Sequence, residues 1–338
     1  MGSSSYSDSV YSTRLRSATL SAKGFDRAFF AHDDDIKTGK VSVGVHEKLD
    51  SSKPNSTGKL VRESFDSPEH PNSKAVAVLF DVTGSMSDVP KSFVKTLDKL
   101  MGFLVKKGYL TDPHILFGAV GDATCDRVPL QIGQFEAGNE MDEVLSLMYL
   151  EGGGGGQQTE SYELAMYYMA RHTDIDCYSK RGERGYLFLS GDELPYSHVK
   201  RSEVKRVIGD DLQEDIPTSE IMEELREKFE VFWILPNNTS YYDDPRIVEP
   251  LKKMFGQNLL KLEDPLAVVE LIAATIGVAE GFDIHDVAAG LKDLGASDSA
   301  VRSTSTALST YAASNTGLSK ATVVGDLVIS GGDGVSRL

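Results

Sequence analysis

The chain has 338 residues, of which 40% are hydrophobic and 25% are charged, and this composition is typical of a soluble globular protein. Its formal net charge of −16 disfavours binding to nucleic acid, because most faces would repel a phosphate backbone. No stretch reaches the ~20 apolar residues that a membrane span requires, and the first residues lack the apolar core of a signal peptide. We therefore expect a cytoplasmic protein that binds neither nucleic acid nor membrane.

Residues 1–72 are rich in Ser, Asp and Lys and have few periodic apolar positions. We expect them to form a polar arm and linker before the folded domain. Within this segment, residues 41–49 alternate between apolar and polar side chains, which predicts a short strand. Gly58 and Lys59 lack the upstream Gly and the following Ser or Thr of a phosphate-binding loop.

Residues 75–87 read AVAVLFDVTGSMS and contain the strongest site signal in the chain. Six apolar residues lead to Asp81, as in a central strand of a parallel sheet that is buried on both faces. Asp81, Thr83 and Ser85 then fall at alternate positions, and Gly84 relieves the turn. One carboxylate and two hydroxyls are hard oxygen ligands, which suit Mg²⁺ or Mn²⁺ better than zinc.

A helix, a parallel strand and an antiparallel strand are predicted next. Ser87 or Asp88 can cap a helix whose apolar residues recur at helical spacing up to about residue 107. Residues 114–120 then form a strand that should run parallel to the first, because a helix connects the two. Residues 128–135 follow after so short a connection that they predict an antiparallel strand at the sheet edge.

This succession, with Asp81, Thr83 and Ser85 in the first loop, resembles the von Willebrand factor A (vWA) family. In that family the metal-ion-dependent adhesion site (MIDAS) begins with Asp-x-Ser/Thr-x-Ser. A Thr from a second loop and an Asp from a third loop complete the site, and one metal position stays open for an acidic group of a partner. The resemblance covers residues 73–281 and is to vWA proteins of the cytosolic, prokaryotic or phage type.

The second loop contains five consecutive glycines at 152–156 and then Thr159. A run of glycines allows the backbone to approach a ligand closely, although a flexible connector would have the same composition. The resemblance implies that Thr159 is a metal ligand at the start of the next helix. The alternative role for Thr159 is the N-cap of that helix.

The third loop follows an apolar strand at residues 185–189 and reads SGDE, where many vWA domains read Thr-Asp-Gly. The resemblance implies that Asp192 is the ligand, since its short side chain leaves room for a water between carboxylate and metal. Glu193 is the alternative. Asp122, after the strand at 114–120, should open onto the same face, where it either supports the ligands or serves as a turn residue.

The rest of the chain continues the alternation of helices and strands. We expect helices at 219–228, 244–256 and 264–279, and strands at 229–235 and 258–262. The whole pattern predicts a doubly wound, Rossmann-like α/β domain with a mostly parallel six-stranded sheet and one antiparallel edge strand. The vWA domain is placed at 73–281. Residues 282–338 form a Ser-, Thr- and Ala-rich extension with one strand-like stretch at 323–329.

The resemblance implies a metal-ion-dependent protein-binding module and not an enzyme. Mg²⁺ or Mn²⁺ would bridge to an Asp or Glu of a protein partner, and the ligands would be Asp81, Thr83, Ser85, Thr159 and Asp192. Such proteins act as adaptors, and some work beside AAA+ ATPases of the MoxR type. Two other classes stay open: a structural subunit that uses its terminal arms, and a haloacid-dehalogenase-like phosphatase, which requires a second Asp where this chain has Thr83.

Overall fold

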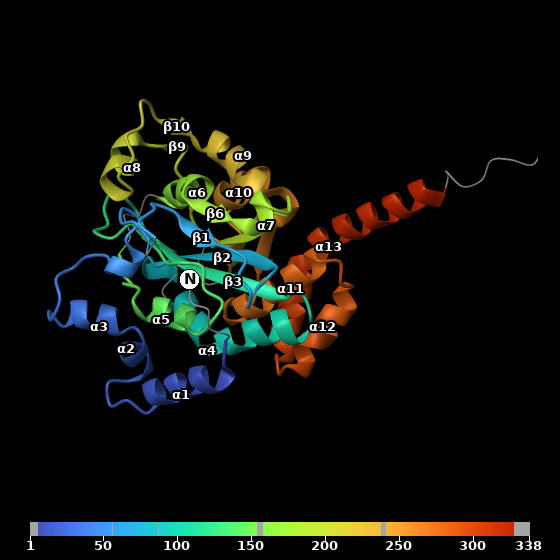
Figure 1. The fold of residues 1–338 in the computed structure, drawn as a ribbon, viewed down its shortest axis with the longest axis horizontal. Coiled ribbons are helices and arrows are strands. Elements are labelled where there is room, and N and C mark those ends of the chain that lie inside the picture. Colours follow the sequence, from blue (N-terminus) through green and yellow to red (C-terminus); the bar gives the residue numbers. More distant parts are fainter. Residues whose placement is uncertain (1–5, 56, 87, 154–157, 238–240, 328–338) are drawn as a thin grey trace, which may run out of the picture.

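The computed structural model describes most of the chain, and Figure 1 shows its fold. The described part comprises residues 6–327 without residues 56, 87, 154–157 and 238–240. Side chains are described for this part except those of residues 85, 88, 98 and 315–327.

A six-stranded sheet forms the centre of the fold, in the order β12–β11–β7–β2–β3–β4. Neighbouring strands run parallel, except that β4 runs antiparallel to β3 at one edge. The strands are β2 (Ser73–Asp81), β3 (Asp112–Val120), β4 (Leu130–Ile132), β7 (Gly185–Ser190), β11 (Phe229–Pro236) and β12 (Leu259–Leu262). The predicted mixed α/β fold with a mostly parallel sheet and an antiparallel edge strand is confirmed.

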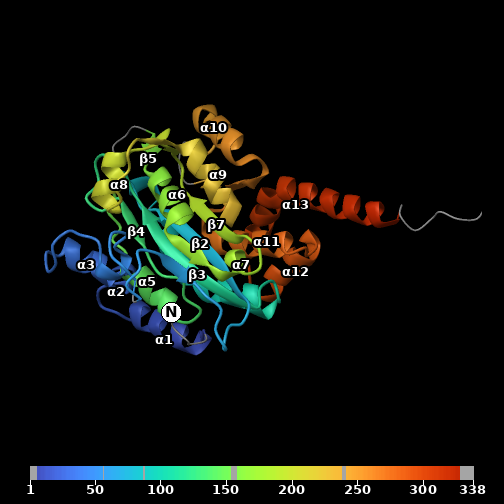
Figure 2. The same cartoon turned by 45° about the horizontal axis from the view of Figure 1, so that its top comes forward.

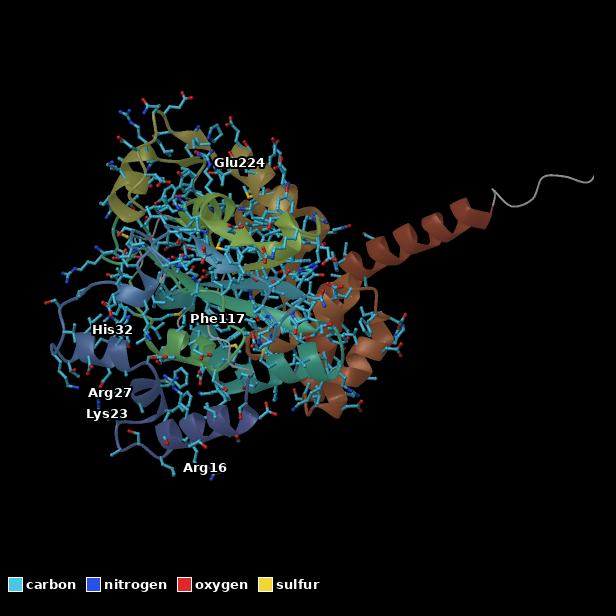
Figure 3. The ribbon with its side chains drawn as sticks, viewed as in Figure 1. Arg16, Lys23, Arg27, His32, Phe117 and Glu224 are labelled. Carbon is cyan, nitrogen blue, oxygen red and sulfur yellow. The ribbon has the colours of Figure 1, made fainter. Side chains whose placement is uncertain are left out.

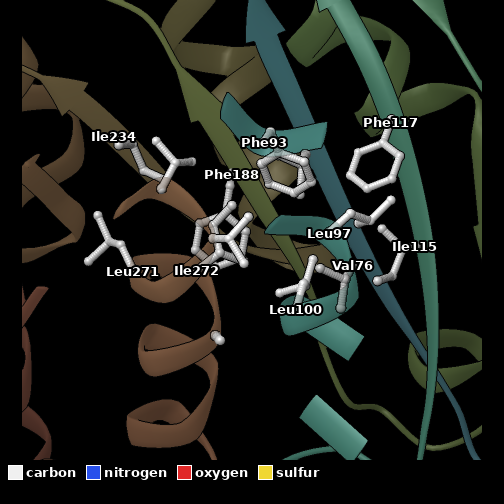
Figure 4. Close-up of a cluster of buried hydrophobic side chains, with 14 of the residues drawn as sticks. Val76, Phe93, Leu97, Leu100, Ile115, Phe117, Phe188, Ile234, Leu271 and Ile272 are labelled. Carbon is white, nitrogen blue, oxygen red and sulfur yellow. The ribbon is translucent and has the colours of Figure 1, made fainter. Parts of the chain in front are cut away.

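The side chains of β2 explain why helices pack on both faces of the sheet. Val76, Val78 and Phe80 belong to one hydrophobic cluster, whereas Ala77 and Leu79 belong to a second cluster on the opposite face. Helices α4 and α11 contribute to the first cluster, shown in Figure 4, and α6, α9 and α10 contribute to the second. These helices are α4 (Asp88–Met101), α6 (Tyr162–Arg171), α9 (Thr218–Lys228), α10 (Pro245–Phe255) and α11 (Val268–Ala279).

Short strands join segments that are distant in the sequence. β1 pairs parallel with β6, β5 pairs parallel with β8, and β9 pairs antiparallel with β10. These strands are β1 (Arg62–Ser64), β5 (Thr159–Glu160), β6 (Thr173–Ile175), β8 (Leu194–Pro195), β9 (His198–Val199) and β10 (Ile216–Pro217). Short helical elements are η2 (Gly84–Met86), η3 (Gly102–Lys106), α5 (Glu140–Ser146), α7 (Asp176–Ser179), α8 (Arg201–Val207), η4 (Gly256–Asn258) and η5 (Pro265–Ala267).

The N-terminal segment packs on the sheet through a few large side chains. Tyr11, Phe29 and Leu49 are buried in the same cluster as the first face of β2. In Figure 3, Phe117 lies inside the molecule, whereas the labelled basic residues of this segment lie at its outer side. The strand expected at 41–49 is wrong, because Val41 and its alternating neighbours find no strand to pair with and Val41 is exposed. The elements here are α1 (Asp8–Thr19), α2 (Phe25–Phe29), α3 (Ala31–Lys37) and η1 (Glu47–Leu49).

The C-terminal segment forms two helices, α12 (Ile284–Asp293) and α13 (Asp298–Leu327). The turned view in Figure 2 shows α13 extending away from the rest of the molecule. The strand-like stretch expected at 323–329 is helical as far as Leu327, since a helix satisfies its backbone hydrogen bonds without a neighbouring strand; residues 328 and 329 lie outside the described part. Within that part, no helix is long and apolar enough to cross a membrane.

Candidate functional site

Asp81 ends β2, and its side chain is completely buried. Its Oδ1 atom accepts hydrogen bonds from the backbone N–H of Thr83 at 2.7 Å and from Thr83 Oγ1 at 2.5 Å. Its Oδ2 atom accepts a hydrogen bond from the Tyr162 hydroxyl at 2.6 Å. Burial raises the pKa of Asp81 to about 6, and the charge of Asp192 contributes to the rise, while the hydrogen bonds oppose it. Asp81 is thus a fixed carboxylate for which a nearby positive charge would be favourable.

The loop after β2 is joined to the glycine-rich second loop through the backbone. Gly84 N–H donates to the Gly153 carbonyl at 2.8 Å, and Gly152 N–H donates to the Val82 carbonyl at 3.2 Å. A Cβ on Gly84 would lie 3.1 Å from the Gly152 carbonyl oxygen, so a side chain there would require the Gly152 backbone to shift by a few tenths of an ångström. The backbone of Ser85 lies in this first loop, in η2, but its side chain is outside the described residues.

Thr159 lies in β5 and is partly exposed, paired with Leu194 of the third loop. The helix that follows, α6, begins at Tyr162, so Thr159 is not its N-cap and that alternative is wrong. The expectation that Thr159 opens the helix is also wrong, because Thr159 itself lies in β5 and the helix begins only at Tyr162. Its role as a metal ligand stays a prediction.

Glu160, the residue after Thr159, is a site residue that the sequence analysis missed. It is 2% exposed, and the carboxylates that act most strongly on it belong to Asp81, Glu193 and Asp122. Burial and these charges raise the pKa of Glu160 to about 10. The sequence signal that could have identified Glu160 is the alternation of a strand, which points the side chains of Thr159 and Glu160 to opposite faces. The sequence does not show that these two residues form a strand, because the strand depends on the pairing of β5 with β8.

The third loop brings two acids to the same region. Asp192 is completely buried and is one of the charges that raise the pKa of Asp81. Glu193 is half-buried, and burial together with Asp192, Asp81 and Asp122 raises its pKa to about 7. Both acids therefore lie near Asp81, and the greater burial of Asp192 favours it as the inner group. The choice between them as a ligand stays a prediction.

Asp122 serves as a turn residue and also lies beside the site. Its carboxylate accepts hydrogen bonds from Thr124 N–H at 2.8 Å and Thr124 Oγ1 at 2.7 Å, and its own backbone N–H donates to Asp126 Oδ2 at 2.7 Å. It is also among the charges that raise the pKa of Glu160 and Glu193. The two roles considered for Asp122 are therefore compatible.

Together these loops form an acidic edge at the carboxyl ends of β2, β3 and β7. Parallel strands bring such ends together, which is where ligands bind in open α/β sheets. Among the described residues, no three His, Cys, Asp or Glu side chains converge as metal ligands. The donor set expected from the sequence does not require such a convergence, because three of its five members are hydroxyls. Its chemistry, hard oxygens with two carboxylates, fits Mg²⁺ or Mn²⁺.

Comparisons with known proteins leave the chain without an assigned family. No protein-family model matches it, and no curated protein matches it. One similar solved structure is the pilus adhesin SpaC from Lactobacillus rhamnosus GG in an open conformation, at 11% identity and a TM-score of 0.42, covering 61% of this chain and 30% of that one. Another is proximal thread matrix protein 1 from the mussel byssus, at 10% identity and a TM-score of 0.41, covering 60% of this chain and 47% of that one.

The chain therefore matches less than half the length of either protein. At these identities and TM-scores, the structural similarity does not indicate a shared function. The class that the structure defines is a mixed α/β protein with a six-stranded, mostly parallel sheet.

Proposed function

We propose that the chain is a metal-ion-dependent protein-binding module with a doubly wound domain of the vWA type. In this proposal Mg²⁺ or Mn²⁺ binds at the carboxyl end of β2 and bridges to an Asp or Glu of a cytoplasmic protein partner. The metal ligands are Asp81, Thr83, Ser85, Thr159 and Asp192. An AAA+ ATPase of the MoxR type is one class of partner that the family resemblance suggests.

The observation that carries the proposal is the buried carboxylate of Asp81 at the end of the central strand. Thr83 orients one of its oxygens through two hydrogen bonds, and Asp192 adds a second buried carboxylate nearby. Two like charges buried close together are costly unless a cation or a proton balances them. A divalent cation would balance both and could still accept an acidic ligand from a partner.

The hydroxyl of Thr83 also argues for binding over phosphatase chemistry. A haloacid-dehalogenase-like phosphatase uses the second acid of its motif as a general acid. Here Thr83 occupies that position and donates its hydrogen to Asp81. Its hydroxyl can ligate a cation, but it cannot supply a proton at neutral pH as a carboxylic acid does.

The experiment compares the wild-type chain with Asp81→Asn. Calorimetric titration should detect Mg²⁺ or Mn²⁺ binding to the wild type and none to the variant. Capture of protein partners from lysate should require the divalent ion, should be reversed by a chelator, and should fall at least tenfold in the variant, equivalent to about 1.4 kcal/mol. The variant should remain folded, because Asp81 lies at the end of β2 and the apolar residues of that strand are unchanged.

Asp211→Asn is the matched control, since its carboxylate is 84% exposed and lies on the surface beside Lys205. It removes the same charge and should leave both metal binding and partner capture unchanged. Absence of divalent-ion binding to the wild-type chain, or capture by Asp81→Asn equal to that by the wild type, would contradict the proposed function.

A further inference from the structure

Glu160 combines deep burial with an unsatisfied carboxylate oxygen. The residue is 2% exposed, and its Oε2 atom is buried without a hydrogen-bond partner. Leaving Oε2 in such a position is unfavourable, because burial removes the hydration of this atom and no hydrogen bond replaces it. A bound cation would take this unpartnered oxygen as a ligand and would remove the cost of its burial.

The backbone around Glu160 is held between two of the acidic loops. Pairing of β5 with β8 places Glu160 opposite Pro195 of the third loop. Ser161 N–H donates to the Gly121 carbonyl at 3.2 Å, and Ser161 Oγ accepts from Ala123 N–H at 2.9 Å. These contacts fix the residue next to the loop after β3 on one side and the loop after β7 on the other.

The charged groups that act most strongly on Glu160 are all carboxylates. They belong to Asp81, Glu193, Asp122 and Asp126, from the loops after β2, β7 and β3. The acidic surroundings of Glu160 and its unpartnered Oε2 atom are two separate observations. A cation beside Oε2 would account for both. A divalent ion would accept Oε2 as a ligand and offset the repulsion among the carboxylates.

We propose that Glu160 is a further ligand of the cation and occupies the position that the partner's acidic group must take. This inference rests on the proposed function and adds a regulation to it. Glu160 would add a third carboxylate to the proposed donor set, and carboxylate oxygens are ligands that Mg²⁺ and Mn²⁺ prefer. No three acidic groups converge among the described residues, so the inference requires Glu160 to move toward Asp81 when the cation binds. A partner then binds by displacing Glu160 from the metal.

The test uses Mn²⁺ as the probe, because its effect on water proton relaxation reports the waters bound to it. In Glu160→Ala, one water should replace the carboxylate, so the relaxivity of the protein-bound Mn²⁺ should rise and its affinity should fall about tenfold, the loss that corresponds to about 1.4 kcal/mol. Glu160→Gln keeps the shape and should also lower the affinity. Acetate, added as a simple carboxylate, should lower the relaxivity more in Glu160→Ala than in the wild type. In this variant the Glu160 carboxylate no longer competes with acetate for Mn²⁺.

Glu163→Gln is the matched control. Glu163 is also completely buried and has an unpartnered Oε1 atom, but the charges that act most strongly on it belong to Glu203 and Asp122. This variant should bind Mn²⁺ as the wild type does. An equal change in Glu163→Gln and Glu160→Gln would overturn the inference, since both changes would then reflect the loss of any buried acid.

The outcomes also separate the inference from the proposed function. If Glu160→Ala binds Mn²⁺ with unchanged affinity and relaxivity while Asp81→Asn binds none, the inference is wrong and the proposed function stands. If the wild-type chain binds no Mn²⁺, both are wrong. Circular dichroism of each variant shows whether a loss of binding comes from unfolding.

Discussion

His114 is a single residue whose pKa is set mainly by burial. It lies in β3 and is 4% exposed, with Nδ1 3.2 Å from Ser64 Oγ and its ring edge-on to His70 at 5.5 Å between centroids. Burial lowers the pKa of His114 to about 4, and the positive charge of His70 acts in the same direction. The nearby carboxylates of Asp112 and Asp66 oppose this effect. His114 therefore stays neutral in the folded chain at pH values where a solvated His is charged.

This property predicts a loss of stability in mild acid. Between pH 6.5 and pH 4 the unfolded chain takes up a proton at this position and the folded chain does not, so the free energy of unfolding falls as the pH falls. The contribution of His114 to this fall is up to about 3 kcal/mol. In urea unfolding at pH 7 and pH 5, His114→Gln should lose less stability between the two pH values than the wild type. Replacing the exposed His198 by Gln should not change the difference, and equal pH dependence in the wild type and His114→Gln would refute the assignment.

At the scale of elements, Tyr162 connects the start of α6 with the ends of β2 and β7. Its hydroxyl donates to Asp81 at 2.6 Å, and its ring packs against Trp233 with centroids 4.6 Å apart. Trp233 Nε1 donates to the Gly191 carbonyl at 3.0 Å. A Cβ on Gly191 would lie 1.9 Å from the Tyr162 hydroxyl oxygen. Gly191 is therefore required so that the third loop can approach α6.

This close approach predicts a strong coupling between the two positions. Gly191→Ala should lower the free energy of unfolding by about 1–3 kcal/mol through overpacking. In a Tyr162→Leu background the same change should cost much less, because the hydroxyl and ring atoms that it meets are gone. A double-mutant cycle from urea unfolding measures the difference. Gly44→Ala, which meets no atom within 4 Å, should be nearly neutral, and additive effects of the Gly191 and Tyr162 changes would contradict the packing described.

At the scale of the whole molecule, the first part of α13 completes the hydrophobic core. Tyr311 is 1% exposed, packs edge-on against Phe232 of β11 at 5.1 Å between centroids, and donates to Glu230 at 2.7 Å. Leu308 is also buried in the same cluster. The sequence analysis assigned these residues to an extension outside the domain, although their side chains cover the sheet.

Two truncations test this arrangement. A chain that ends at Ser297 loses α13 and exposes Phe232, so it should unfold at a clearly lower temperature, with a loss of about 2–3 kcal/mol for each large apolar side chain uncovered. A chain that ends at Ser314 keeps Leu308 and Tyr311 and should melt close to the wild type. Equal melting temperatures for the two truncated chains would show that the contacts of α13 contribute nothing to stability.

Local sequence patterns were sufficient to predict the strands of the central sheet. Long apolar runs at β2, β3, β7 and β11 predicted buried strands, and the short connection before β4 predicted the antiparallel edge. These features depend on neighbouring residues, because a run of apolar side chains or a short loop restricts the local backbone whatever the rest of the chain does. The same reasoning located the acids of the first and third loops, Asp81 and Asp192, at one edge of the sheet.

The loop residues that face one another at this edge could not be predicted in the same way. Glu160 and Tyr162 acquire their environment from the pairing of β5 with β8 and from the contact of α6 with Gly191. The packing of Tyr11 and Tyr311 on the sheet likewise depends on segments far apart in the sequence. Short-range periodicity contains no information on such contacts, because they arise when the whole core is formed and each loop takes the place left by the others. Local sequence therefore determines where a strand or helix forms, whereas the assembled fold determines which residues make up the site.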